Sequence, residues 1–191
     1  APGGAVRGTA FSEQRLNRVA ALGAPAFIDG NRALRYGYSL GFLKPLVDAG
    51  LARRAGPFAT DLPVAEDFHW YLDCLLAGGR WRVVTDTLYR YTLTPGSLSR
   101  SLSIADVEAI RSRGAATIAK VQGAGNGGNG GDPAVLRALA RRQTSIELML
   151  AHMRFVQALK DGAAGRALGV TLRRPGVVPY IVKFGLEGAV K

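Results

Sequence analysis

One short stretch, VAEDFHWYLDCLLAGGRWRVV at residues 64–84, constrains the fold more than any other part of the sequence. Two adjacent carboxylates, Glu66 and Asp67, stand at its start, where a helix favours negative charge. Apolar side chains then recur at helical spacing and form one stripe for burial: Phe68, Tyr71, Leu72, Leu75 and Leu76. Gly78 and Gly79 end this pattern ahead of a short apolar segment. The stretch predicts an amphipathic helix followed by a strand, and hence an α/β protein.

Two more helices are predicted from their start signals. Ser103 stands three residues ahead of Asp106, at the spacing of a capping box, and opens SIADVEAIRSRGAATIAKV. Asp132 followed by Pro133 is typical of a helix start, and the apolar pattern continues to about Lys160.

The segment GAGNGGNGGD separates these two helices and has the composition of a flexible linker. The tail after the second helix is basic and apolar, and its prolines, Pro175 and Pro179, break any continuous helix. The chain is therefore expected to have three parts: a catalytic-domain part at residues 1–122, the linker at 123–132, and a helical basic extension at 133–191.

Three further elements are expected from weaker patterns. SEQRLNRVAAL, residues 12–22, predicts a short helix, and another is expected near Lys44–Leu51, ending at a glycine. RWRVVTDTLYRYTL, residues 80–93, is rich in Val, Thr and Tyr and predicts one or two β segments.

The charge balance favours phosphate-bearing partners. Lys and Arg number 25 against 14 acidic residues, a net charge of +11. No nucleic-acid-binding motif is present, and acidic groups cluster at residues 61–73, so specific nucleic-acid binding is not expected. No apolar run is long enough to cross a bilayer. Cys74 is the single cysteine, which excludes an intrachain disulfide and predicts a buried, inert thiol.

The ordered set of motifs in VAEDFHWYLDCLLAGGRWRVVTDTLYRYTLTPGSLSR resembles the C-terminal part of the catalytic domain of family-2 glycosyltransferases, of the bacterial exopolysaccharide-biosynthesis type. These are inverting enzymes with a GT-A fold that use nucleotide-diphosphate sugars. The resemblance covers about residues 64–100, and YSLGFLKPL upstream and RRPG in the tail are also similar to such proteins. It implies an incomplete GT-A-like fold, the acceptor-side half, followed by a mainly helical C-terminal extension.

Enzymes of this family begin with a βαβ nucleotide-binding half and a D-x-D motif that holds a divalent metal, Mg or Mn. The sequence contains no D-x-D, and no alternating βα pattern precedes residue 30. The chain is therefore expected to be part of a longer enzyme and inactive by itself. Its expected location is the cytoplasm, or the inner face of the cell membrane as a peripheral protein.

The resemblance implies that Asp67 is the catalytic base, which takes a proton from the acceptor hydroxyl during inverting transfer. Glu66 is then a supporting residue that contacts the acceptor, a saccharide or a lipid-linked sugar. A simpler interpretation remains open: both carboxylates only stabilise the start of their helix.

Four other side chains are implied in binding the diphosphate of the donor sugar. Ser97, Ser99 and Arg100, in the hydroxyl-rich loop GSLSR, resemble a loop that closes on that diphosphate. Arg90, between two tyrosines, is the fourth. The alternatives are an ordinary capped turn for the loop and a solvent-facing position for Arg90.

Two other functional classes remain open: a non-catalytic remnant that binds sugar or a partner chain, and a basic nucleic-acid-binding module. The basic-apolar tail either lies on an anionic membrane surface or packs back onto the domain.

Overall fold

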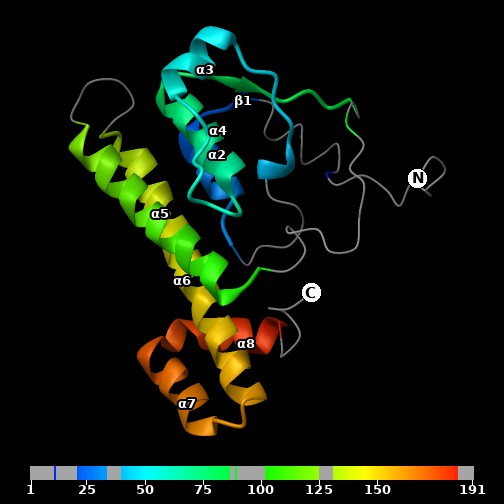
Figure 1. Ribbon diagram of the computed structural model, residues 1–191, viewed down its shortest axis with the longest axis vertical. Helices are drawn as coiled ribbons and strands as arrows, with labels where there is room; N and C mark the ends of the chain where they lie inside the picture. Colours follow the sequence, from blue (N-terminus) through cyan, green and yellow to red (C-terminus); the bar gives the residue numbers. More distant parts are fainter. Residues whose placement is uncertain are drawn as a thin grey trace, which may run out of the picture.

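The computed structural model describes residues 11, 21–33, 40–86, 89, 102–124 and 131–184. Helices predominate among them, with one small sheet (Figure 1). In chain order the elements are β1 (Ala21–Leu22), α2 (Ala24–Gly30), η1 (Leu40–Phe42), α3 (Ala49–Ala55), α4 (Glu66–Leu76), β2 (Trp81–Arg82), α5 (Ile104–Gly123), α6 (Pro133–Lys160), α7 (Ala164–Arg173), η3 (Pro175–Val177) and α8 (Val178–Phe184).

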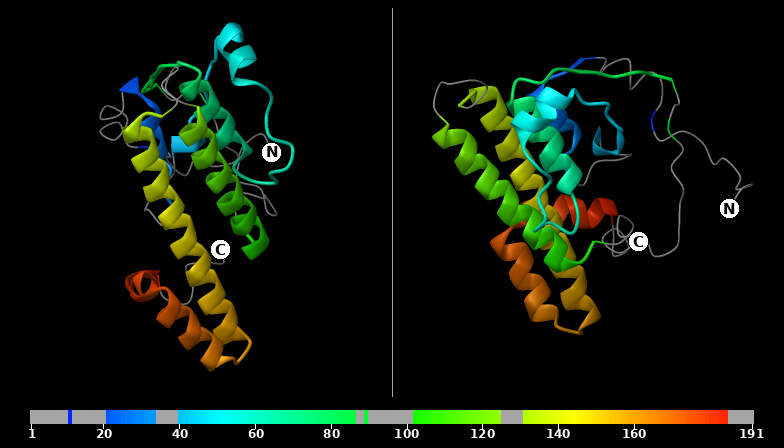
Figure 2. Two further views of the ribbon diagram at one scale, coloured as in Figure 1. Left: turned by 90° about the vertical axis from the view of Figure 1, so that its left-hand side faces the viewer. Right: turned by 45° about the horizontal axis from the view of Figure 1, so that its top comes forward.

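The two longest helices, α5 and α6, lie side by side and run in opposite directions (Figures 1 and 2). The start signals found in the sequence are formed. The Ser103 hydroxyl accepts the Asp106 N–H at 3.1 Å, while Asp106 accepts the Ser103 N–H at 2.8 Å. Asp132 accepts the Ala134 N–H at 2.7 Å. Both predicted helices are confirmed, because their capping groups satisfy backbone donors that a helix start leaves unpaired.

The helix predicted from the acidic pair is also confirmed, as α4. It ends as the two glycines predict: Gly78 has φ 92°, and the Gly79 N–H donates to the Cys74 carbonyl at 3.0 Å. A Cβ on Gly79 would lie 2.6 Å from that oxygen, so the turn has no room for any other residue. Cys74 is fully buried, as expected, and burial raises the pKa of its thiol.

Two expected helices are wrong in position. The helix expected near Lys44–Leu51 is α3, which begins only after Asp48, whose carboxylate accepts the Leu51 N–H at 2.9 Å, and ends at Gly56. The helix expected at 12–22 is wrong at its end, because Ala21–Leu22 form β1; residues 12–20 lie outside the described residues. The Asp48 cap determines where α3 begins, and pairing with another strand determines β1. A short apolar pattern in the sequence reveals neither of them.

The sheet is a two-stranded antiparallel pair, in which Ala21 lies opposite Arg82 and Leu22 opposite Trp81. The strand predicted within residues 80–93 is therefore present as β2, but only as two residues, and 87, 88 and 90–93 lie outside the description. A mixed α/β chain is confirmed in this coarse sense. The GT-A-like architecture expected from the resemblance stays a prediction.

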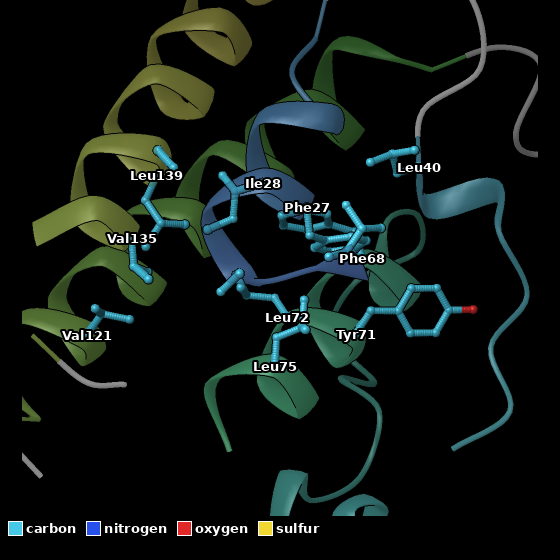
Figure 3. Packing of buried hydrophobic residues seen from close by; sticks show 13 residues of the cluster. Phe27, Ile28, Leu40, Phe68, Tyr71, Leu72, Leu75, Val121, Val135 and Leu139 are labelled. Carbon is cyan, nitrogen blue, oxygen red and sulfur yellow. The ribbon is translucent and has the colours of Figure 1, made fainter. Parts of the chain in front are cut away.

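One apolar cluster ties α2, α4, α5 and α6 together (Figure 3). Phe27 of α2 is fully buried at its centre, stacked on Phe68 of α4 with ring centroids 5.4 Å apart. Val121 and Val135, which flank the Gly-rich segment, belong to the same cluster. The segment thus joins two adjacent helices that share a core, and the three-part division of the chain stays a prediction.

Beyond this core, α6 continues into a small C-terminal group formed by α7, η3 and α8 (Figure 1). The expected break in the tail is confirmed at Pro175, which begins η3 after α7 has ended. Pro179 does not break a helix: it lies in the first turn of α8, where a missing N–H costs nothing. Within the described residues, no helix has the length and apolar character needed to cross a membrane.

Candidate functional site

The candidate site is the first turn of α4, which begins from an unusual backbone conformation. Ala65, the residue before the helix, has φ 69° and ψ 17° and offers no side-chain cap. A left-handed conformation costs a non-glycine residue about 1–2 kcal/mol. Ala65 is half-buried and packs against the cluster around Phe27. It also packs against a second apolar cluster between α5 and α6, which consists of Val107, Ile110, Ile146, Leu150 and Met153. This packing sets the direction in which the following two carboxylates leave the backbone.

Asp67 keeps one carboxylate oxygen available. Its Oδ1 accepts the N–H of the next residue, Phe68, at 2.6 Å, so the side chain does help to satisfy the helix start. No described residue donates to its Oδ2. Glu66 precedes it in the same turn, and both side chains are half-exposed. The helix-stabilising role and the proton-accepting role are therefore compatible in Asp67, because they use different oxygens.

Tyr71 lies one helical turn after Asp67, on the same face of α4. It is buried, and burial together with the nearby Asp67 and Glu66 carboxylates raises its pKa to about 12. Its phenol therefore stays protonated at neutral pH and can donate a hydrogen bond. In Figure 3 its hydroxyl points away from the labelled leucines. The sequence predicted only a core position for Tyr71; its i+4 spacing from Asp67 was the available signal.

His69 lies on another side of α4 and faces α5. It is buried, and its Nδ1 lies 3.5 Å from the Thr117 hydroxyl. Burial, reinforced by the positive charges of Arg142 and Arg113, lowers the pKa of His69 to about 3. The imidazole is therefore neutral at pH 7, and it forms no pair with Asp67.

The depressed pKa of His69 predicts an acid-sensitive fold. Between pH 6.5 and about 3 the unfolded chain binds a proton at this histidine and the folded chain does not, so stability falls as the pH falls. Each pH unit in that window is worth up to about 1.4 kcal/mol. The free energy of unfolding of the 191-residue chain, measured with urea, should be about 2 kcal/mol lower at pH 5 than at pH 7 because of His69.

The matched variant is His69→Gln, which keeps a polar group near Thr117 and removes the titration. Its unfolding free energy should change between pH 7 and pH 5 by about 2 kcal/mol less than that of the original chain. Asp106, whose pKa is lowered by its bonds to Ser103, is present in both proteins, so its effect cancels from the comparison. Equal changes in both proteins would contradict the assignment.

An aromatic pair joins α4 to the segment that precedes it. The Trp70 indole N–H donates to the Gly56 carbonyl at 2.8 Å, and its ring stacks on Phe58 with centroids 4.6 Å apart. These contacts anchor the segment between α3 and α4. An open surface groove of about 460 Å³ lies beside them, lined by Ala52, Arg53, Gly56, Pro57, Phe58 and Trp70. Trp70 is thus a structural anchor whose partner Phe58 remains half-exposed.

A buried cation lies behind the first turn of α4. The guanidinium carbon of Arg142, from α6, lies 3.6 Å from the centre of the Phe68 ring, whose stacking partner is Phe27. Burial lowers the pKa of Arg142 to about 9, so the group stays charged at neutral pH. No carboxylate in the described part of the chain pairs with it, and the cation–π contact to Phe68 stabilises it. The sequence showed Arg142 only as one of several scattered arginines.

The other implied binding residues cannot be placed beside Asp67. Ser97, Ser99, Arg100 and Arg90 all lie outside the described residues. The described residues also contain no group of three His, Cys, Asp or Glu side chains that could bind a divalent metal. No step is therefore assigned to a metal held by these residues.

The fold and the site together define a largely helical α/β protein with a carboxylate pair at a helix N-terminus, held in place by a strained residue and an aromatic core. No protein-family model matches the chain, and no solved structure matches it.

A comparison with curated proteins is more specific. Over 101 residues the chain is 33% identical to the succinoglycan biosynthesis protein ExoO of Rhizobium meliloti (strain 1021). The match covers 52% of this chain and 29% of that relative, so the chain spans less than a third of the relative's length. A similarity to proteins of exopolysaccharide synthesis, expected from the motifs, is confirmed at this level.

Proposed function

We propose that this chain is the acceptor-side part of an inverting glycosyltransferase that acts in surface or extracellular polysaccharide synthesis. The donor is a nucleotide-diphosphate sugar, and the acceptor is a hydroxyl of a saccharide or of a lipid-linked sugar. The observation that carries the proposal is that Asp67, at the start of α4, uses Oδ1 to accept the Phe68 N–H, while no described residue donates to its Oδ2. The similarity to a succinoglycan biosynthesis protein supports the biological setting.

Asp67 is the base in the proposed reaction. Its Oδ2 takes the proton of the acceptor hydroxyl while the hydroxyl oxygen attacks the anomeric carbon. The new carbon–oxygen bond forms as the bond to the nucleotide diphosphate breaks, and the diphosphate leaves with the electron pair. Attack opposite the leaving group inverts the anomeric configuration. The helix N-terminus favours a negative charge on the waiting carboxylate, and α4 holds it rigidly.

The remaining roles are assigned by position and by the resemblance. Glu66, in the same turn, contacts the acceptor sugar. Tyr71 is proposed as a positioning residue: it lies one helical turn after Asp67 on the same face of α4, and its phenol stays protonated. Ser97, Ser99, Arg100 and Arg90 donate to the phosphate oxygens of the donor. A divalent metal held through a D-x-D motif elsewhere in the complete enzyme completes the diphosphate site.

The experiment supplies a panel of nucleotide-diphosphate sugars and oligosaccharide acceptors to a complete protein that contains this chain. Release of nucleoside diphosphate should depend on the acceptor, and the product linkage, read by NMR, should have the opposite anomeric configuration to the donor. The isolated 191-residue chain should release none. A retained configuration would exclude the single-displacement mechanism and with it a base at Asp67.

A further inference from the structure

The C-terminal helices expose apolar side chains that ordinary packing would bury. Leu168 and Leu172 of α7 are 59% and 73% exposed, and Val178 and Val182 of α8 are 45% and 81% exposed. Each pair is spaced by four residues, so its members lie on one side of their helix. These four residues are called the apolar C-terminal face. Its exposure is unusual, because scattered single apolar residues, not neighbouring pairs, are typical of a protein surface.

The helix α7 packs against the rest of the chain through a different residue. Ala167 is 3% exposed and is the residue through which α7 packs against the rest of the chain. In α8 no residue is buried. Both helices lie at one end of the molecule, away from β1 and α2 to α4 (Figures 1 and 2). The apolar C-terminal face is therefore not covered by the described part of this chain.

The segment that carries this face is basic in sequence. Residues 162–184 contain four cations, Arg166, Arg173, Arg174 and Lys183, and no Asp or Glu. Arg166 is paired with Asp161 at 3.1 Å and Arg174 with Glu147 at 2.8 Å. Arg173, in the last turn of α7, forms no ion pair with any described residue. An apolar face bordered by cations is complementary to a surface that has an anionic outer layer and an apolar interior.

We propose that the apolar C-terminal face binds the surface of a bilayer that contains anionic phospholipid. Leu168, Leu172 and Val182 enter the boundary between headgroups and acyl chains, where apolar side chains leave water. Arg173 and Lys183 contact the lipid phosphates, with their aliphatic stems along the apolar layer. The proposal does not depend on the proposed catalytic function, since it uses none of the residues of α4.

The test measures sedimentation of the 191-residue chain with vesicles of phosphatidylcholine alone and with about 30% phosphatidylglycerol, a content that gives a negative surface. Binding should require the anionic lipid and should weaken as salt rises from 50 to about 500 mM. Leu172→Ser and Leu168→Ser should each lower the partition coefficient about tenfold, because each removes part of a buried leucine's transfer free energy. Arg173→Ala and Lys183→Ala should each lower it about fivefold.

Leu46→Ser is the matched control, because Leu46 is fully exposed on the segment before α3 and lies outside the proposed face. It should bind vesicles like the original chain, and thermal unfolding should show that all variants are folded. Absent binding, equal binding to neutral vesicles, or binding that the leucine variants retain would overturn the proposal. So would a dimer in sedimentation velocity that Leu172→Ser converts to a monomer, since the face would then bind a second copy.

Discussion

Asp67→Asn, introduced into an active protein that contains this chain, is expected to lower kcat by about 10²–10⁴-fold, the usual contribution of a positioned general base. Asparagine cannot take the proton of the acceptor hydroxyl. It can still accept the Phe68 N–H through its own Oδ1, so the start of α4 is preserved. Binding of the donor nucleotide sugar should be nearly unchanged. Steady-state kinetics together with donor titration separates these effects.

The same variant distinguishes a base from a helix-stabilising residue. Loss of a charge at a helix start costs about 0.3–1 kcal/mol of stability and leaves chemistry intact. Asp73→Asn is the matched control: Asp73 lies in the same helix and pairs with Lys120 at 2.9 Å, and its loss should leave kcat within about twofold because exposed ion pairs contribute little. If the Asp67→Asn protein had the same kcat as the original protein, the assignment of the base would be wrong.

Phe27→Ala is expected to destabilise the 191-residue chain by about 3–5 kcal/mol. Phe27 is fully buried and contacts three aromatic rings: Phe68 at 5.4 Å, Tyr71 at 6.3 Å and Trp81 at 5.1 Å between centroids. Its removal leaves a cavity and takes away the stacking partner of Phe68. For a chain of this size the melting temperature should fall by about 6–20 °C, measured by circular dichroism.

Leu46→Ala provides the comparison for this substitution, because it removes apolar atoms from a fully exposed side chain. Its unfolding free energy should change by less than about 0.5 kcal/mol. A Phe27→Ala protein that melted within about 3 °C of the original would contradict the aromatic cluster, since no cavity of that size is free of cost.

The Asp67 and Phe27 substitutions affect the same part of the structure. Phe68 follows Asp67 directly, donates its N–H to that carboxylate, and places its ring between Phe27 and Arg142. The aromatic core therefore packs against the residue that follows the candidate base. A core substitution such as Phe27→Ala should lower activity at temperatures where the protein is still folded.

Three helices could be predicted from the sequence because their signals are local. Ser103 and Asp106 stand within one turn of each other, Asp132 precedes its own helix, and the α4 stripe ends in two glycines. Such signals act between residues only a few positions apart, so they are readable without the fold. The acidic pair at the start of α4 was also found in this way, whereas the role of Asp67 as a base was implied by the family resemblance and stays a prediction.

Other features depend on residues that are distant in the sequence. β1 exists because Leu22 lies opposite Trp81, and the pattern around Leu22 resembled a helix. Arg142 was indistinguishable from the other arginines until α6 packed it onto Phe68. The burial that lowers the pKa of His69 likewise comes from the packing of α4 onto α5 and α6.

The sequence by itself determined where the main helices begin and end, and which carboxylates stand at the start of α4. The tertiary structure decided which oxygen of Asp67 receives no hydrogen bond from the described residues, how strongly burial raises the pKa of Tyr71, and which apolar side chains α7 and α8 leave exposed. The physical reason is that capping bonds form within one helical turn, whereas burial and charge proximity arise only when separate helices pack together.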